Sequence, residues 1–499
     1  MPRPYAAAFV RPPVLTPQSI STDSDGAKVN HYRITMSQAA AQILPRKTTN
    51  ILGFNGIFPG PTIELEQGTR SMVHMRNQLP KNHPTLGHLL ATSTHLHGSA
   101  SLPQYDGYAS DVTLSGFYKD YFYPNFQAAR TLWYHDHGVH FTAQNVYSGL
   151  AALYIMHDKE ERELLPQGSF DVPLVISDAM FAADGSLGYD DRDRSGLWGD
   201  VVLVNGRPWP VMQVQPRVYR FRILNASVSR SYRPTLSTGD PVHVVATDGG
   251  LIPRTQAVKY WRHGSAERYE VLIDFGKYKP GQRIELRNLS NENNRDFDHT
   301  NKIMAFDVVA PPSEREMKLD PKWNFIPTTL VDSHVMGLTR NDAEKKRQFR
   351  VQRGDPDGPW NVSGMTWEDV IASNFKLAGA DPKLNGVEIW EIENKSGGWF
   401  HPIHIHLVDF QILSRNGKPA AAWERGPKDV MYVGENEKIQ VIMQFGPHKG
   451  RYMVHCHNLV HEDHSMMFQF RVGLGVNDPD PNDPILAAPA KLDPETGPE

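Results

Sequence analysis

The chain contains a single cysteine, Cys456, and a histidine lies on each side of it. Two further side chains that can bind a metal, His461 and Met466, follow at equal steps of five residues. A thiolate, two imidazoles and a weakly bound thioether form the ligand set of a copper site that transfers single electrons. Only the second imidazole must come from another part of the chain. The segment therefore predicts a copper site built around Cys456.

The residues that lead to Cys456 predict a β-strand with two different faces. Side chains alternate between the faces of a strand, so Cys456 is expected on one face and its neighbours His455 and His457 on the other. One thiolate can then hold a copper on one side while the two imidazoles hold other metals on the far side. Such an arrangement is useful only where electrons pass between metal centres.

Three further segments contain His-x-His pairs, which place two imidazoles on one face of a strand. They are His95-Leu96-His97, His135-Asp136-His137 and His404-Ile405-His406. Together with His455 and His457, the four pairs give eight imidazoles. His401 and His461 are left over, and they complete the Cys456 site. Eight imidazoles suit three coppers, two with three ligands and one with two, and such a cluster can pass four electrons to O2 together with the first copper.

The four motifs resemble those of the multicopper oxidase family, and the resemblance extends over most of the chain. It is strongest toward bilirubin oxidases and the related bacterial spore-coat laccases. The stretches that carry it are HLHGSASLPQYDGYASD, TLWYHDH, GGWFHPIHIHLVDFQILSR and HCHNLVHEDHSMM. The resemblance implies an oxidase that takes single electrons from a small reducing molecule and converts O2 to water. Bilirubin and other tetrapyrroles, phenols and aromatic amines are the reductants that it implies.

The resemblance also implies four coppers and assigns their ligands. His95 and His404 are expected to hold a type 2 copper. A type 3 copper pair is expected at His97, His135, His137, His406, His455 and His457. A type 1 copper is expected at His401, Cys456, His461 and Met466. Met467 is the alternative axial ligand, although it is expected to face the opposite side of the chain.

Buried carboxylates beside a metal can supply the protons that O2 reduction consumes. Asp106 and Glu462 are the candidates, because the resemblance implies that carboxylates at these positions feed protons to the cluster. The alternatives are a turn residue, since a glycine follows Asp106, and a solvated loop charge at Glu462. Asp136 lies between two expected ligands and should point away from the metals.

Two further residues are expected beside the type 1 copper. Trp399 lies two residues before His401, where bilirubin oxidases have a tryptophan that could relay electrons or tune the site. The alternative for Trp399 is simple packing. Asn458 also matches a residue of the family, and hydrogen bonds around the sulfur tune the potential of such sites.

Short alternating strands separated by glycines and prolines predict β-sandwiches. The resemblance implies the same fold class, all-β with three cupredoxin-like Greek-key β-sandwich domains. We expect domains at residues 18–158, 165–310 and 325–475, a proline-rich linker at 308–322 and a disordered tail at 477–499. Because the ligands come from the first and third domains, the three-copper cluster should lie at their interface, with the middle domain as a spacer.

Bulk composition excludes several function classes. A net charge of −4 predicts no basic face for nucleic acid. No apolar run approaches the roughly 18 residues that span a membrane. The N-terminus has no signal-peptide pattern, so we expect a cytoplasmic or spore-associated protein, or a secreted one whose leader was removed. A small-molecule reductant and O2 are the expected partners, and the oligomeric state stays open.

Other functions are compatible with the same ligands. A metallo-oxidase for Cu(I) or Fe(II) is one, although the 16 methionines are scattered and form no dense insert. An aminophenol-coupling oxidase similar to phenoxazinone synthases is another. A copper-binding or coat-structural protein with incidental activity is a third, but it would have no reason to keep a complete ligand set.

Overall fold

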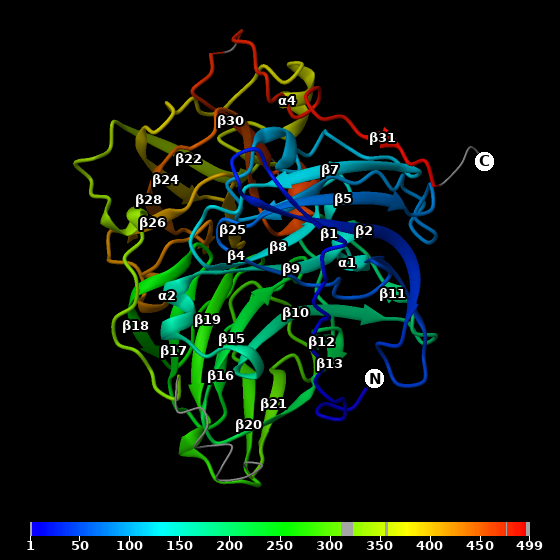
Figure 1. The fold of residues 1–499 in the computed structure, drawn as a ribbon, viewed down its shortest axis with the longest axis vertical. Helices are drawn as coiled ribbons and strands as arrows, with labels where there is room; N and C mark the ends of the chain where they lie inside the picture. Colours follow the sequence, from blue (N-terminus) through cyan, green and yellow to red (C-terminus); the bar gives the residue numbers. More distant parts are fainter. Residues whose placement is uncertain (1, 311–322, 355–357, 476, 496–499) are drawn as a thin grey trace.

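The computed structural model describes residues 2–310, 323–354, 358–475 and 477–495, and most of its regular structure is β-sheet. The strands form six sheets, and each sheet takes nearly all of its strands from one part of the chain. We call these parts the first unit (β1–β9), the middle unit (β10–β21) and the third unit (β22–β30). Figure 1 shows the middle unit in green at one end of the molecule, with the first and third units together at the other.

The first unit contains two sheets. One has the order β1-β2-β5-β7-β31 with β3 on β2, and the other the order β4-β9-β8-β6. The strands are β1 (Ser19–Thr22), β2 (Lys28–Ala41), β3 (Thr49–Phe54), β4 (Ile63–Glu66), β5 (Arg70–Gln78), β6 (Thr94–His97), β7 (Phe117–Tyr123), β8 (Arg130–Asp136), β9 (Ala151–His157) and β31 (Lys491–Leu492). Alternate residues of β2, including Ile34 and Met36, are buried in a core that also contains Val73 and Leu132.

The middle unit has an eight-stranded sheet and a four-stranded sheet around the largest core of the described residues. The strands are β10 (Asp171–Phe181), β11 (Leu187–Gly188), β12 (Val201–Val204), β13 (Arg207–Pro208), β14 (Val211–Val214), β15 (Val218–Asn225), β16 (Pro234–Leu236), β17 (Val242–Thr247), β18 (Gly250–Val258), β19 (Arg268–Asp274), β20 (Arg283–Asn288) and β21 (Lys302–Val308). The sheets hold no His-x-His pair, as the sequence indicates.

The third unit has sheets of the order β23-β22-β24-β28-β26 and β27-β25-β29-β30. The strands are β22 (Lys345–Arg353), β23 (Trp360–Val362), β24 (Val387–Asn394), β25 (His401–Ile405), β26 (Phe410–Arg415), β27 (Val430–Val433), β28 (Lys438–Gln444), β29 (Gly450–Cys456) and β30 (Met467–Val472). The core between the sheets reaches Cys456 and Met466, so the thiol lies at the edge of an apolar layer.

The helices are short and lie between strands. They are α1 (Thr142–Ser148), α2 (Lys159–Leu164), α4 (Trp367–Ala372) and α5 (Leu459–Asp463), with 3-10 turns η1 (Pro103–Tyr105), η2 (Gly168–Phe170), η3 (Phe275–Lys277), η4 (His334–Gly337) and η5 (Ala422–Glu424). Asp463 of α5 accepts hydrogen bonds from the backbone N–H groups of Thr142 and Ala143, at 3.0 and 2.7 Å, and so joins the third unit to the first. No helix in the described ranges is long and apolar enough to cross a membrane.

The C-terminal segment differs from the disordered tail predicted at 477–499. Within the described residues 477–495, Lys491 and Leu492 form β31 against β7. The Asp493 carboxylate accepts a hydrogen bond of 2.5 Å from Arg76, and both side chains are buried. The polar composition was misleading because Asp493 and Asp483 are paired with Arg76 of the first unit and Arg451 of the third unit. The predicted linker at 308–322 lies almost wholly outside the described residues.

We predict that Asp493→Ala destabilises the protein. The variant leaves the buried Arg76 with only the exposed Glu495 as a partner, and losing one side of a buried ion pair costs up to about 3–5 kcal/mol. The free energy of unfolding in denaturant measures the effect. Glu495→Ala is the matched control, since Glu495 also pairs with Arg76 but its side chain is 56% exposed and should contribute less than about 1 kcal/mol. Equal losses in both variants would contradict the prediction.

Candidate metal centres

His401, Cys456 and His461 form one buried group, which we call the thiolate site. His401 begins β25, Cys456 ends β29 and His461 lies on α5. The Sγ atom of Cys456 is 3.4 Å from Nδ1 of His401 and 3.7 Å from Nδ1 of His461, and the two Nδ1 atoms are 3.1 Å apart. Three donor atoms therefore converge on one point.

The outer nitrogens of both imidazoles are occupied. Nε2 of His401 donates to Oγ of Ser396 at 2.8 Å, and that hydroxyl donates onward to Asn394. Nε2 of His461 donates to the carbonyl of Ser195 at 2.8 Å. Each ring thus carries its proton on Nε2 and turns the lone pair of Nδ1 toward the sulfur, as a metal ligand must. Ser195 belongs to the middle unit, which is therefore more than the expected spacer.

The sulfur of Cys456 lies in an apolar layer, where the two imidazoles and the backbone N–H of Asn458 are the polar groups that face it. Burial raises the pKa of the Cys456 thiol well above its usual value, while a hydrogen bond from the backbone N–H of Asn458 lowers it. A buried thiolate needs a nearby positive charge, and a bound metal ion deprotonates a coordinating thiol. The Asn458 side chain donates to the Ser195 carbonyl at 3.2 Å rather than to the sulfur.

The two neighbouring methionines lie on different sides of the third unit. Met466 is fully buried in the same core as Cys456, and its backbone carbonyl accepts a hydrogen bond from the Cys456 N–H at 3.1 Å. Met467 begins β30 and packs in a separate cluster with Tyr108 and Met453. This difference favours Met466 over Met467 as an axial ligand.

Aromatic rings surround the two imidazoles of the thiolate site. Trp399 lies just before β25, and its ring centroid is 5.8 Å from that of His461. Trp360 is closer, at 4.0 Å from His461 and 5.3 Å from His401, and sequence reasoning missed it because it lies on β23 far from any motif. Trp198 of the middle unit stacks on Trp399 at 6.3 Å.

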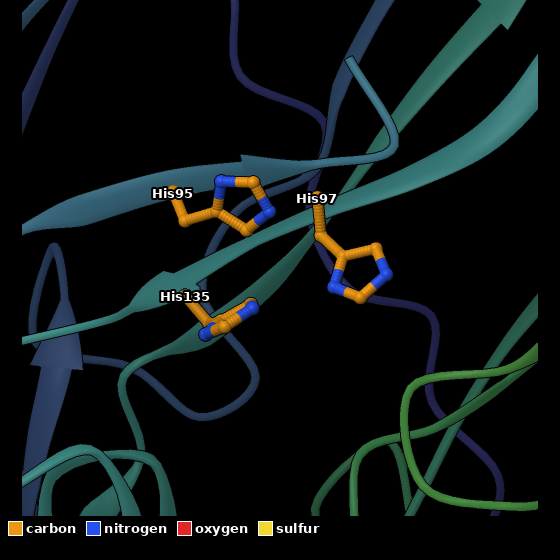
Figure 2. A group of neighbouring side chains, drawn as sticks. All are labelled: His95, His97 and His135. Atoms are coloured by element: carbon orange, nitrogen blue, oxygen red, sulfur yellow. The ribbon is translucent and has the colours of Figure 1, made fainter. Parts of the chain in front are cut away.

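The four His-x-His pairs come together in one buried group, which we call the histidine cluster. His95 and His97 lie on β6, and His95 is opposite His135 of β8. Figure 2 shows these three rings projecting from the two neighbouring strands. The third unit supplies the other half through β25 and β29, where His404 is opposite His455. The cluster therefore lies where the first and third units meet, as the ligand count predicted.

The rings of the histidine cluster form one packed group, in which the centroids of His97 and His404 are 3.7 Å apart and those of His95 and His406 are 4.0 Å apart. Nε2 of His455 is 3.1 Å from Nε2 of both His137 and His406. Nε2 of His95 is 3.4 Å from Nε2 of His404. The remaining rings, His97, His135 and His457, lie 5.1–5.8 Å apart between centroids. Nδ1 of His97, Nε2 of His135 and both ring nitrogens of His457 are buried and have no hydrogen-bond partner.

The protein fixes several of these rings from outside the cluster. Nδ1 of His95 donates to the carbonyl of Asp106 at 2.5 Å, and Nδ1 of His404 donates to the carbonyl of Asp429 at 2.8 Å. Both rings therefore turn a bare Nε2 inward. Burial lowers the pKa of all the cluster imidazoles for which a shift is resolved, so they are neutral and able to bind a metal at neutral pH. Converging, unpartnered lone pairs on buried neutral imidazoles fit copper.

Both predicted carboxylates touch the histidine cluster. Oδ2 of Asp106 accepts from Nδ1 of His406 at 2.8 Å, and Oδ1 has no partner. Burial raises the Asp106 pKa well above its usual value. Oε2 of Glu462 is 2.9 Å from Nδ1 of His455. Burial would raise the Glu462 pKa, but positive charge on His455 and His137 lowers it to about 2, and a metal ion bound by these rings would act in the same direction.

Asp136 points away from the cluster, as predicted. Its Oδ1 accepts from the backbone N–H of Ser93 at 2.8 Å, and its Oδ2 accepts from the Asn145 amide at 2.8 Å. These bonds hold the backbone between His135 and His137. The residue is therefore structural, and its carboxylate faces α1 rather than a metal.

Comparison with known proteins agrees with this geometry. Sequence profiles described as multicopper oxidase match residues 35–161 and 342–475. The chain is 39% identical to the bilirubin oxidase of Albifimbria verrucaria, over 92% of this chain and 79% of the relative. It is 32% identical to a laccase of Bacillus subtilis, over 90% of this chain and 96% of the relative. The chain belongs to the multicopper oxidase family.

Solved structures of multicopper oxidases share the fold. A laccase from Pediococcus acidilactici superimposes with a TM-score of 0.79 at 28% identity, over 94% of this chain and 95% of that one. A variant multicopper oxidase from Aquifex aeolicus gives 0.80 at 28% identity, over 93% and 100%. The predicted all-β fold of cupredoxin-like sandwiches is confirmed. The protein is thus an oxidoreductase of a copper-dependent family.

We predict that Met466→Leu keeps copper in the thiolate site and raises its reduction potential. The axial ligand tunes such sites, and a leucine cannot donate a thioether lone pair to Cu(II). Met467→Leu is the control and should leave the potential nearly unchanged, because Met467 packs in another cluster. Redox titration of the blue absorption measures both. The opposite pattern would transfer the axial role to Met467.

Proposed function

We propose that this multicopper oxidase couples the one-electron oxidation of a small organic reductant to the four-electron reduction of O2 to water. The observation that carries the proposal is the position of Cys456. Its side chain belongs to the thiolate site, while the adjacent His455 and His457 belong to the histidine cluster. Two donor sets are thereby joined through a few covalent bonds, which is of use only for electron transfer between them.

We assign one type 1 copper to His401, Cys456, His461 and Met466. His95 and His404 are assigned to a type 2 copper, because their Nε2 atoms face each other. The type 3 pair is assigned to His137, His406 and His455 for one ion and to His97, His135 and His457 for the other. Bound copper would supply single-electron chemistry at the thiolate site and O2 reduction at the histidine cluster.

The reductant is proposed to bind in a cavity of about 690 Å³ beside the thiolate site. Its lining includes Tyr189, Leu197, Trp198, Arg295 and Phe297. This volume is in the range of small-molecule sites. Trp198 joins the cavity to Trp399, whose ring contacts His461. The aromatic rings in the lining suit a flat conjugated reductant such as a tetrapyrrole, phenol or aromatic amine. The lining also contains Met180, Asp190 and Asp193, whose side chains can bind a metal ion, so a metallo-oxidase for Cu(I) or Fe(II) is the second candidate.

Asp106 and Glu462 are proposed to hold the protons that O2 reduction consumes. Each carboxylate touches a histidine of the proposed type 3 pair, so it lies one ring away from where oxygen would be reduced. The unpartnered Oδ1 of Asp106 is free to carry a proton, and burial raises the Asp106 pKa, which favours the protonated acid. The two residues approach the cluster from the first and third units.

We expect the copper-loaded protein to be blue and to contain about four coppers, from the ligand count. Cys456→Ser should lose the blue colour and substrate oxidation while keeping the fold, since the chain has one cysteine and no disulfide. Elemental analysis, absorption spectroscopy and O2 uptake with bilirubin, a phenol, an aminophenol, Cu(I) and Fe(II) measure these properties. His263→Gln changes a buried histidine outside both sites and should keep four coppers. A blue Cys456→Ser variant would refute the assignment.

Asp106→Asn and Glu462→Gln should each slow the oxygen half-reaction and not the reductant half-reaction. A carboxamide keeps the shape but cannot release a proton at working pH. Both variants should stay blue, bind about four coppers and bleach with reductant under argon at the parental rate. Steady-state turnover should fall by about 10²-fold, and the double variant should lose little more if both act in one relay.

The control for these variants is Asp111→Asn. Asp111 is also a buried carboxylate of the first unit, but its partner is Lys119 and not a histidine of the cluster. Its removal should lower stability and leave the oxygen half-reaction unchanged. Full turnover in both Asp106→Asn and Glu462→Gln would contradict the prediction. Asp106 would then be only a turn residue and Glu462 only a loop charge.

A further inference from the structure

A buried ion pair between the middle and third units lies directly behind two rings of the histidine cluster. Arg268 begins β19, and Asp429 immediately precedes β27. Resting on the function proposed above, we propose that Arg268 and Asp429 are positioning residues that set which nitrogen of His97 and of His404 faces the metals. The middle unit, which holds no ligand itself, would thereby control the ligand geometry of both other units.

Every N–H group of the Arg268 guanidinium donates a hydrogen bond, so the group cannot rotate without losing some of them. Its Nη1 and Nη2 donate to Oδ1 and Oδ2 of Asp429 at 2.7 and 2.5 Å. The other three N–H groups donate to backbone carbonyls of Thr131, Ala266 and Asp248, at 2.8, 3.1 and 3.1 Å. Five donors thus meet five acceptors, with the carboxylate held by the two-pronged contact that arginine favours.

Asp429 contacts two rings of the histidine cluster through two different oxygens. Its carboxylate Oδ1 lies 3.1 Å from Nε2 of His97, and its backbone carbonyl accepts from Nδ1 of His404 at 2.8 Å. A carboxylate accepts hydrogen bonds, so Nε2 of His97 carries the proton and Nδ1 is left bare. That Nδ1 is buried without a partner. His97 therefore presents Nδ1, whereas His404 presents Nε2.

The backbone of Asp429 is fixed as well. Oδ2 of Asp248 accepts from the backbone N–H groups of Asp429 and Val430, both at 3.1 Å. Lys428 is 3.0 Å from the same carboxylate oxygen of Asp248 and 2.9 Å from Glu267. All of these side chains are buried. The middle unit thus holds Asp429 at the carboxylate through Arg268 and at the peptide through Asp248.

The glycine after the first His-x-His pair makes room for the ion pair. Gly98 has a φ of +91°, and a Cβ there would lie 2.6 Å from Nη2 of Arg268 and 2.7 Å from Oδ2 of Asp429. Any side chain would push the pair away from His97. The glycine of the first His-x-His motif is therefore required by the ion pair, whose two residues belong to other units.

If the ion pair only stabilised the interface, its loss would lower stability and leave the orientation of the His97 and His404 rings unchanged. Copper affinity depends on that orientation, so measuring it distinguishes a positioning role from a structural one. In Asp429→Asn the amide oxygen can keep the contacts of Oδ1 with His97 and Nη1 of Arg268, but the NH2 group then faces Nη2 of Arg268, donor against donor, and the two-pronged contact is lost. Arg268→Lys keeps the charge and loses the two-pronged contact. We expect the histidine cluster of either variant to bind copper about 10–100-fold more weakly in competition with a chelator, as is typical when a group that orients a metal ligand is lost. The electron paramagnetic resonance signal of its copper should change, while the blue band of the thiolate site stays parental.

Arg222→Lys is the matched control. Arg222 lies on the neighbouring strand β15, is equally buried and makes the same two-pronged contact with Asp171, but touches no histidine of either site. It should lower stability and keep parental copper affinity. Parental affinity and resonance signals in Arg268→Lys or in Asp429→Asn, or an equal loss in Arg222→Lys, would overturn the proposal. If the parent protein itself binds no copper at the histidine cluster, the proposed function fails. If the parent binds copper and the variants match it, only the positioning role of Arg268 and Asp429 fails.

Discussion

The register between β25 and β29 is the constraint on which both metal centres depend. Ile403 is opposite Cys456, and His404 is opposite His455. Because side chains alternate along each strand, this pairing puts the thiol in the apolar core and the imidazoles on the other face of the same sheet. A slip by one residue would exchange the faces and destroy both sites at once. The surrounding sheets, including β27 and β30 on either side of this pair, hold that register in place.

The meeting of the candidate ligands was predictable because each motif carries its own geometry. A His-x-His pair on a strand is enough to place two rings together, and the lone Cys456 between histidines joins two sets. The sheets then explain why motifs more than 300 residues apart meet, since β6 and β8 face β25 and β29 across the interface of the first and third units. The sequence alone predicted that the first and third units meet, because the candidate ligands are divided between these two parts of the chain.

The groups that orient the ligands were not predictable from the chain. Ser195, Trp360, Arg268 and Asp429 lie in no motif. The first two and Asp429 reach a histidine, and Arg268 reaches Asp429, only after folding. Their residue types are ordinary in strands and loops, so no local pattern distinguishes them. The C-terminal segment was misread for a similar reason, because an Asp-rich composition predicts solvation and cannot reveal that Asp493 pairs with Arg76. Long-range polar pairing is the information that a single sequence lacks.

Burial of the histidines also prepares the protein for metal at neutral pH. Desolvation lowers the pKa of the cluster rings below that of an exposed histidine, about 6.5, so they carry no proton that a metal must displace. The thiol of Cys456 is the opposite case, since burial raises its pKa and binding must release its proton. The same shifts make the metal-free fold sensitive to acid. As the pH falls below about 6.5, the unfolded chain takes up protons that the buried rings refuse, and stability is lost progressively toward the lower pKa values of the folded state. A site preorganised for copper therefore makes the empty protein depend on neutral pH for its stability.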